Sequence, residues 1–264
     1  MRAILFFIAC LLAGACTPRL ETIEIPFAVR YGETEIGCNS PDAGPALSDL
    51  RLYVHSVRLF DESGAAIDVA LTADGIWQSK DIALLDFENG EGACINGSPQ
   101  TNVVLRGEYS GRAATGLRLE IGVPEGLNHN DPMLAEAPLS FTAMHWHWKS
   151  GYKFMRAGLR TPGDDGFWMH LGSDRCEGTI DNILGCRSAN RPFVDLPGYR
   201  PDASIVVIDL QRLTRDINLA DRALSQCQSG PTEKECVAPF SSLGLDFDSG
   251  DTVSAATVFR VEAL

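Results

Sequence analysis

The sequence has few basic residues for its length. It holds 22 Lys and Arg against 35 Asp and Glu in 264 residues, a formal net charge of −13 with neutral histidines. Phosphate backbones and anionic lipid headgroups repel a surface of this sign. The composition therefore argues against nucleic acid or an anionic membrane surface as a partner.

The sequence also lacks the short motifs of common catalytic sites. It contains no G-x-S-x-G nucleophile turn, no H-E-x-x-H zinc motif and no glycine-rich phosphate loop. Acidic residues are so frequent that a pair of carboxylates does not distinguish a catalytic site from an ordinary acidic surface. We therefore expect a protein that is not itself an enzyme.

Long apolar runs are missing as well, since none reaches the about 20 residues of a membrane-spanning helix. The N-terminus instead has Arg2, an apolar stretch over residues 4–15 and small residues before Cys16. This layout is typical of a signal peptide. Cys16 stands where a bacterial lipoprotein carries its lipidated cysteine, although Ala13 occupies a position that favours Leu.

We expect residues 1–15 to be a signal peptide, and residues 16–264 to form one β domain with Cys16 as its lipidated first residue. Cleavage without lipidation is the alternative. The expected location is the periplasm or the outer membrane of a Gram-negative bacterium, with membrane contact only through a lipid anchor.

Six cysteines remain when Cys10 and Cys16 are set aside. An even number in an exported chain indicates disulfides. Spacing favours two short loops and one long loop, in the pairs Cys176–Cys186, Cys227–Cys236 and Cys38–Cys94. A cysteine-ligated metal is the alternative, but the sequence has no C-x-x-C pair.

Period-2 alternation predicts a mainly β protein, an antiparallel β-sandwich with long loops and a few short helices. The expected strands are 22–31, 49–61, 102–108, 116–123, 141–148, 166–171, 192–196, 204–210 and 253–262. Residues 82–87 fit a strand or a loop, and residues 217–226 and 238–243 fit short helices. In 49–61 the apolar parity switches after Val54, which predicts a bulge or burial on both faces.

Histidine and tryptophan are scarce, with five and four copies, yet two of each fall within the five residues 144–148. On a strand, Trp146 and Trp148 would share one face and His145 and His147 the other. A strand with core tryptophans and solvated histidines explains this pattern. A metal or redox site explains it too, because imidazole is the commonest metal ligand and indoles are oxidisable.

The other three histidines have ordinary interpretations as well. His129 lies in a loop beside Asp131, where a histidine is usually solvated but would have a carboxylate to orient it as a ligand. His170 lies in an apolar stretch, where the ordinary interpretation is a core histidine whose ring nitrogens are hydrogen-bonded. The same interpretation holds for His55 on its strand.

Several ordered motifs resemble the MbnP family, also described as the four-cysteine member of a metallo-mystery pair. They cover most of the chain from about residue 50 to 245. The motifs in the first half are LYVH (52–55), VRL (57–59), ALLDFENG (83–90), GVP (122–124), LNH (127–129) and DP (131–132). Those that follow are APL (137–139), M-x-W-x-W (144–148), GYKF (151–154) and HLGS (170–173). The matching cysteines are Cys94, Cys176, Cys186, Cys227 and Cys236.

This resemblance implies an exported β-rich protein that binds copper. It implies a partner, a MauG-like dihaem cytochrome c peroxidase of the MbnH type, that oxidises a tryptophan to kynurenine. Trp146 and Trp148 are then the modification candidates. His55, His129 and His170 are the metal-ligand candidates, and His145 and His147 are additional ones because the family usually has an aromatic and a small polar residue there.

We therefore expect a copper-handling protein, activated by oxidation of a tryptophan and not a catalyst. The alternative is an exported, non-catalytic binding module that offers Trp146 and Trp148 as an aromatic platform for a peptide or a sugar.

Overall fold

A computed structural model describes residues 20–264 except 42, 163, 181, 220 and 222–224. The expected signal peptide, residues 1–15, and the expected lipidation site Cys16 lie outside the described residues. None of the described helices is long and apolar enough to cross a membrane.

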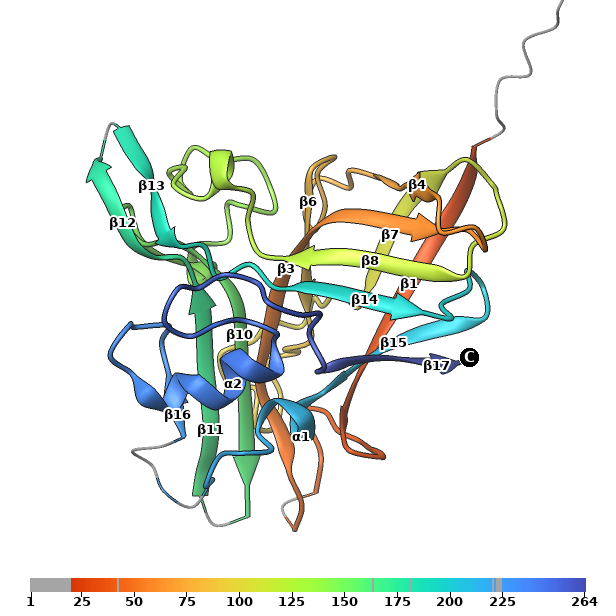
Figure 1. Cartoon of the computed structure of the whole chain (residues 1–264). Coiled ribbons are helices and arrows are strands. Elements are labelled where there is room, and N and C mark those ends of the chain that lie inside the picture. The colour runs from red at the N-terminus through yellow and green to blue at the C-terminus, as the bar shows by residue number, and fades with distance from the viewer. Residues whose placement is uncertain (1–19, 42, 163, 181, 220, 222–224) are drawn as a thin grey trace, which may run out of the picture.

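Two large β-sheets form the frame of the protein (Figure 1). The first has the order β17-β15-β1-β7-β5, with β2 beside β1. Its strands are β1 (Glu21–Tyr31), β2 (Thr34–Glu35), β5 (Ala70–Leu71), β7 (Val104–Tyr109), β15 (Ser204–Asp209) and β17 (Phe259–Ala263). The pairing is antiparallel apart from the parallel pair β1 and β15.

The second sheet has the order β14-β8-β3-β10-β11-β16, with β4 and β6 beside β3 and β9 beside β10. Its strands are β3 (Ala46–Phe60), β4 (Ala66–Asp68), β6 (Ile82–Asp86), β8 (Gly116–Ile121), β9 (His145–His147), β10 (Gly151–Thr161), β11 (Asp164–Gly172), β14 (Phe193–Pro197) and β16 (Gln226–Cys227). The hairpin of β12 (Asp174–Thr179) and β13 (Asn182–Ser188) forms a separate two-stranded sheet.

Helices are short and few within the described residues, as expected. The α-helices are α1 (Leu210–Leu213) and α2 (Val237–Ser242), and single 3-10 turns span Glu125–Leu127, Thr142–Met144 and Lys234–Cys236. Both large sheets contribute side chains to one hydrophobic core, for example Ile25 from β1, Val206 from β15 and Leu52 from β3. The prediction of a mainly β sandwich is confirmed.

The parity switch in β3 has both of the predicted causes. Residues 50–55 are all buried, so this stretch faces protein on both sides. Ser56 then has a φ of 52°, and the pairing of β3 with β8 shifts register between His55 and Arg58. This bulge returns Val57 and Leu59 to the core and leaves the side chain of His55 facing a cavity beside β8.

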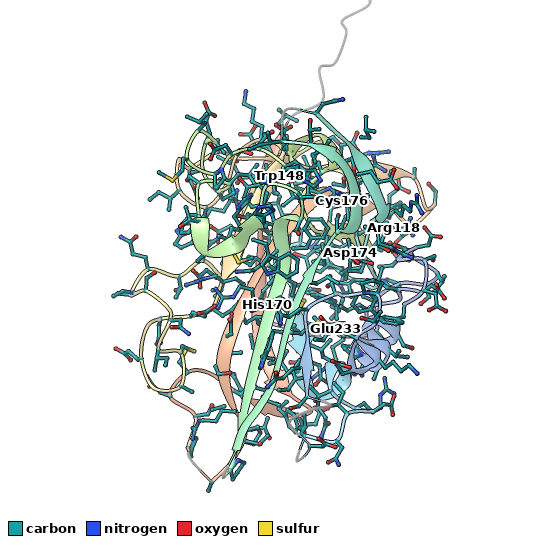
Figure 2. The ribbon with its side chains drawn as sticks, turned by 90° about the vertical axis from the view of Figure 1, so that its left-hand side faces the viewer. Arg118, Trp148, His170, Asp174, Cys176 and Glu233 are labelled. Atoms are coloured by element: carbon teal, nitrogen blue, oxygen red, sulfur yellow. A yellow bond between two sulfur atoms is a disulfide. The ribbon has the colours of Figure 1, made fainter. Side chains whose placement is uncertain are left out.

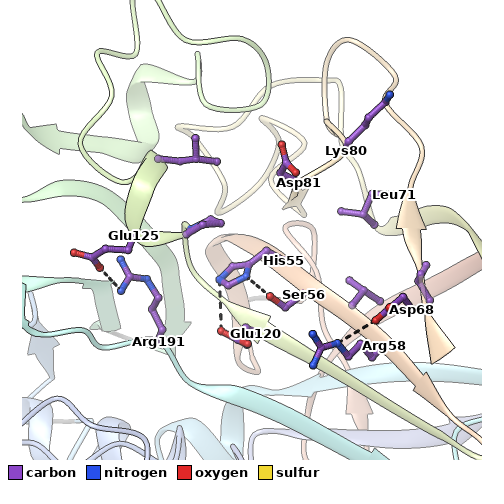
Figure 3. Close-up of a pocket in the computed structure, with 14 residues that line it drawn as sticks. His55, Ser56, Arg58, Asp68, Leu71, Lys80, Asp81, Glu120, Glu125 and Arg191 are labelled. Carbon is purple, nitrogen blue, oxygen red and sulfur yellow. Dashed lines mark hydrogen bonds and ion pairs between the residues drawn. The ribbon is translucent and has the colours of Figure 1, made fainter. Parts of the chain in front are cut away.

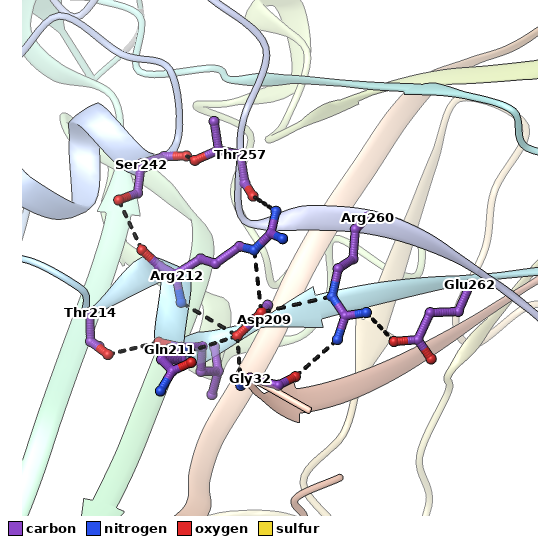
Figure 4. A network of polar contacts seen from close by, with 10 residues as sticks. Gly32, Asp209, Gln211, Arg212, Thr214, Ser242, Thr257, Arg260 and Glu262 are labelled. Atoms are coloured by element: carbon purple, nitrogen blue, oxygen red, sulfur yellow. Dashed lines mark hydrogen bonds and ion pairs between the residues drawn. The ribbon is translucent and has the colours of Figure 1, made fainter. Parts of the chain in front are cut away.

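Asp209 ties the first sheet to the helix that follows it (Figure 4). Its Oδ1 accepts hydrogen bonds from the backbone N–H groups of Gln211 (3.0 Å) and Arg212 (3.4 Å), which caps α1. The same atom accepts from Gly32 N (3.0 Å) at the end of β1, and Oδ2 lies 3.8 Å from Arg260 Nε on β17. One buried carboxylate therefore fixes three elements.

The structure corrects several of the sequence-based expectations. Residues 141–148 are not one strand, because a 3-10 turn precedes the three-residue β9. The described residues of 217–226 form no helix, and Gln226 begins β16. The C-terminal strand is shorter than residues 253–262.

The sequence patterns also missed the central strand β10 and the hairpin of β12 and β13. Arg156, Arg160 and Gly158 interrupt the apolar pattern of β10. Glycines and charged residues do the same in the hairpin.

Candidate functional site

The segment with two histidines and two tryptophans sits at the start of β10. His147 and His145 of β9 pair with Gly151 and Tyr152 of β10. Trp148 follows β9 in the turn that joins the two strands. Because β9 is only three residues long, the chain presents these rings near a sheet edge, and both tryptophans stay half-buried.

His129 is held against this turn by a hydrogen bond to the main chain. Its Nδ1 lies 3.0 Å from the carbonyl oxygen of Trp148. A carbonyl oxygen only accepts, so the proton is on Nδ1 and, in the neutral ring, Nε2 carries the lone pair. Nε2 faces the amide of Asn128 at 3.3 Å and Sγ of Cys186 at 3.4 Å.

Asn128 is fully buried and is oriented by β10. Its Oδ1 accepts a hydrogen bond from Tyr152 N (3.1 Å), which leaves its amide nitrogen to face His129. Gly151 makes this approach possible, because a Cβ there would lie 2.4 Å from the carbonyl oxygen of Asn128 and its φ is +74°. The motif around Asn128 and His129 is thus joined to the start of β10.

His145 is the most shielded histidine of the segment. Its ring packs edge-on against Tyr152, with centroids 5.0 Å apart, and Nε2 has no hydrogen-bond partner in the described part of the chain. Burial lowers the pKa of His145, Asp131 opposes that shift, and His147, Lys153 and His129 add to it. Trp148 is contacted by the two other histidines, since His129 Nδ1 lies 3.0 Å from its carbonyl oxygen and the ring centroid of His147 lies 5.3 Å from that of its indole. A neutral imidazole is the form that binds metal.

His170 lies between two tryptophans on the outer face of β11. Its ring centroid is 5.1 Å from that of Trp168 and 6.2 Å from that of Trp146. The ring of Trp146 also packs against Gly172, where a Cβ would lie 2.5 Å from the indole. Burial, followed by the charge of Arg156, lowers the pKa of His170 to about 4. His170 is therefore half-buried against indoles and not a core histidine.

A row of charged groups crosses the sheet next to His170. One residue on each of four neighbouring strands lies in register: Asp86 on β6, Arg51 on β3, Arg156 on β10 and His170 on β11. Arg51 Nε lies 2.8 Å from Asp86 Oδ2 and 3.5 Å from Glu88 Oε1, and Arg156 pairs with Asp49. Burial, with the carboxyl group of Asp49 nearby, raises the pKa of Glu88 to about 9.

His55 faces a different cavity, which has a volume of about 720 Å³ (Figure 3). Its Nδ1 lies 2.8 Å from Ser56 Oγ, and its Nε2 lies 3.9 Å from Glu120 Oε2. Only 5% of the residue is exposed, and burial followed by the charge of Arg191 lowers the pKa of His55 to about 4. The structure thus places His55 in a cavity lined neither by the other four histidines nor by the tryptophans.

The six cysteines that the structure describes form three disulfides, in the pairs that the spacing favours: Cys38–Cys94, Cys176–Cys186 and Cys227–Cys236. Two of them lie in groups of metal-type ligands whose atoms are within 4.8 Å of one another. Among the described residues these groups are His129 with Cys176 and Cys186, and Glu233 with Cys227 and Cys236. While the disulfides persist, the sulfurs are not thiolates and do not act as strong ligands.

Sequence reasoning did not foresee that Cys176–Cys186 lies beside His129, or that Asn128 and Tyr152 support this histidine. These residues are far apart in the chain, and their order along it contains no signal for the contact. Figure 2 shows Trp148 and Cys176 toward one end of the molecule, with His170 farther along β11. Trp77 stacks on Phe141, with ring centroids 5.1 Å apart.

Comparison with known proteins gives a family and a solved structure. The family model described as MbnP matches residues 20–229. The structure of MbnP from Methylosinus trichosporium is similar, with a TM-score of 0.80 and 26% sequence identity, over 93% of this chain and 99% of that chain. No curated protein sequence matches.

Proposed function

This chain belongs to the MbnP family, and on that premise we propose that it is an exported copper-binding protein, not an enzyme, in which a partner dihaem peroxidase oxidises Trp146 or Trp148 to kynurenine. The proposed location is the periplasm or the outer membrane, with Cys16 as the anchor. The observation that supports the copper site best is the contact of His129 and His147 with Trp148, next to His145 on β9.

The ligands would come from these three histidines and the new kynurenine. The Nδ1 proton of His129 is engaged by Trp148 O, so that Nε2 carries the lone pair, which a metal would take over from the amide of Asn128. Nε2 of His145 has no hydrogen-bond partner among the described residues. An unmodified indole offers only an N–H donor, whereas kynurenine has an aniline nitrogen and a ketone oxygen that can ligate. Oxidation would therefore complete the site.

The oxidation is balanced by hydrogen peroxide, the oxidant of a peroxidase. Two molecules of peroxide supply the two oxygen atoms that cleave the C2–C3 bond of the indole, and two molecules of water are released. A further water hydrolyses the N-formyl group, and formate leaves. The residue gains one oxygen atom and loses one carbon atom, a change that mass spectrometry detects.

The test compares the purified protein before and after treatment with its partner and peroxide. We expect the peptide that contains Trp146 and Trp148 to carry the kynurenine mass, and copper affinity to rise with it. Trp77→Phe is the control, because Trp77 is outside the W-x-W motif and its ring stacks on Phe141. An unchanged peptide mass contradicts the oxidation. Copper affinity no higher than that of scattered surface histidines favours the aromatic platform for a peptide or a sugar.

A further inference from the structure

The Cys176–Cys186 disulfide differs from the other two in its surroundings. It joins opposite residues of β12 and β13, a hairpin that pairs with no other described strand. Sγ of Cys186 lies 3.4 Å from Nε2 of His129. The disulfide therefore lies between the hairpin and the histidine that is hydrogen-bonded to Trp148.

Exposure makes this disulfide the most reachable of the three. The four cysteines of the other pairs are at most 5% exposed, whereas Cys186 is only half-buried. Disulfide exchange requires an external thiolate to approach one sulfur atom along the S–S axis. A reductant can thus meet Cys186 while the other pairs remain shielded.

His129 already has the arrangement of a metal ligand. Histidines that bind metal usually donate their second ring N–H to a carboxylate or a carbonyl group, which fixes the tautomer and the direction of the ring. Trp148 O plays that part here at 3.0 Å. Nε2, which carries the lone pair, lies 3.4 Å from Sγ of Cys186, and it lies within 4.8 Å of both sulfurs.

We propose that reduction of Cys176–Cys186 opens a Cys₂His site for a soft, thiophilic cation such as Cu(I). An external dithiol supplies two electrons: its thiolate attacks one sulfur, the S–S bond breaks, and the dithiol leaves as a disulfide. The two cysteine thiols then release their protons as the cation binds. Two thiolates and one neutral imidazole suit Cu(I), which prefers soft ligands.

This site shares His129 with the proposed function but does not need kynurenine. It would make copper binding respond to the redox state of the compartment as well as to the partner peroxidase. Protein whose tryptophans are unmodified, in which the proposed copper site is incomplete, therefore isolates the Cys₂His site.

The experiment measures Cu(I) affinity against a chromophoric chelator, before and after mild treatment with a phosphine reductant. Alkylation and peptide mapping identify the free cysteines. We expect Cys176 and Cys186 to label before the other four, and one equivalent of Cu(I) to bind at least about 100-fold more tightly after reduction. Cd²⁺, as a second probe, should give a thiolate-to-metal charge-transfer band.

Matched variants separate this site from non-specific thiol binding. His129→Ala keeps the disulfide and should weaken Cu(I) binding to the reduced protein by more than about tenfold. The double variant Cys176→Ser with Cys186→Ser should show no increase in Cu(I) affinity on reduction. The double variant Cys227→Ser with Cys236→Ser should still show that increase. Free Cys176 and Cys186 without any gain in affinity would overturn the proposal, and so would a gain that His129→Ala leaves intact. Failure of copper binding in the kynurenine form without reductant would instead count against the proposed function.

Discussion

Nδ1 of His129 lies 3.0 Å from the carbonyl oxygen of Trp148, so a loop histidine is fixed to the main chain of the tryptophan pair. The hydrogen bond sets the tautomer and turns Nε2 toward Cys186. Two residues that are 19 positions apart in the sequence thereby become one unit. This unit is the common element of the proposed copper site and of the proposed redox-dependent site.

His129→Ala should lower the copper affinity of the partner-treated protein by more than about tenfold, because one ligand is lost. The measurement is competition with a copper chelator. His55→Gln is the matched control, since His55 faces another cavity, and its affinity should stay within about twofold of the wild type. Equal loss in both variants would contradict the placement of copper near Trp148.

Gly151→Ala should destabilise the fold by about 2 kcal/mol or more, because φ is +74° and the new Cβ would lie 2.4 Å from Asn128 O. Urea unfolding measures the change. Gly126→Ala is the control, because no atom lies within 4 Å of its Cβ position, and we expect a change within about 0.5 kcal/mol. Equal stability of the two variants would show that Asn128 is not held so closely against β10.

Glu88 should make the protein less stable as the pH rises. Its pKa in the folded state is raised to about 9, so between its ordinary value of 4.5 and that pH the folded state binds more protons than the unfolded state. The contribution of Glu88 is complete below the unfolded pKa and is lost as the pH rises toward 9. Glu88→Gln, which cannot ionise, should flatten the decline in unfolding free energy between pH 5 and 9. A slope as steep as in the wild type would contradict the buried, protonated carboxyl group.

His55 and His170 should make the protein less stable as the pH falls, which is the opposite of the effect of Glu88. Burial lowers both pKa values to about 4, from an ordinary value of 6.5. Between these values the unfolded state binds more protons, so stability is complete above pH 6.5 and falls as the pH drops toward 4. The double variant His55→Gln with His170→Gln should lose less stability between pH 6.5 and 4.5 than the wild type does. Urea unfolding at several pH values measures this, and an unchanged slope would count against the burial of the two rings.

Much of the fold was accessible from local patterns. Alternation predicted β1, β3, β8 and β15 closely, because half-buried strands repeat with period 2. The parity switch near His55 predicted the bulge. β10 was missed because Arg156 and Arg160 look like surface residues, while tertiary structure pairs Arg156 with Asp49 and covers it.

The sequence by itself determined the β-rich class, the favoured cysteine pairs and the small set of histidines and tryptophans, because these depend on composition, spacing and short-range periodicity. Only the tertiary structure decided which of them meet. Strand register places His170 between Trp146 and Trp168, and the β12–β13 hairpin brings Cys186 to His129, while the bulge turns His55 toward another cavity. Such contacts come from the pairing of distant strands, and no local pattern in the chain encodes that pairing.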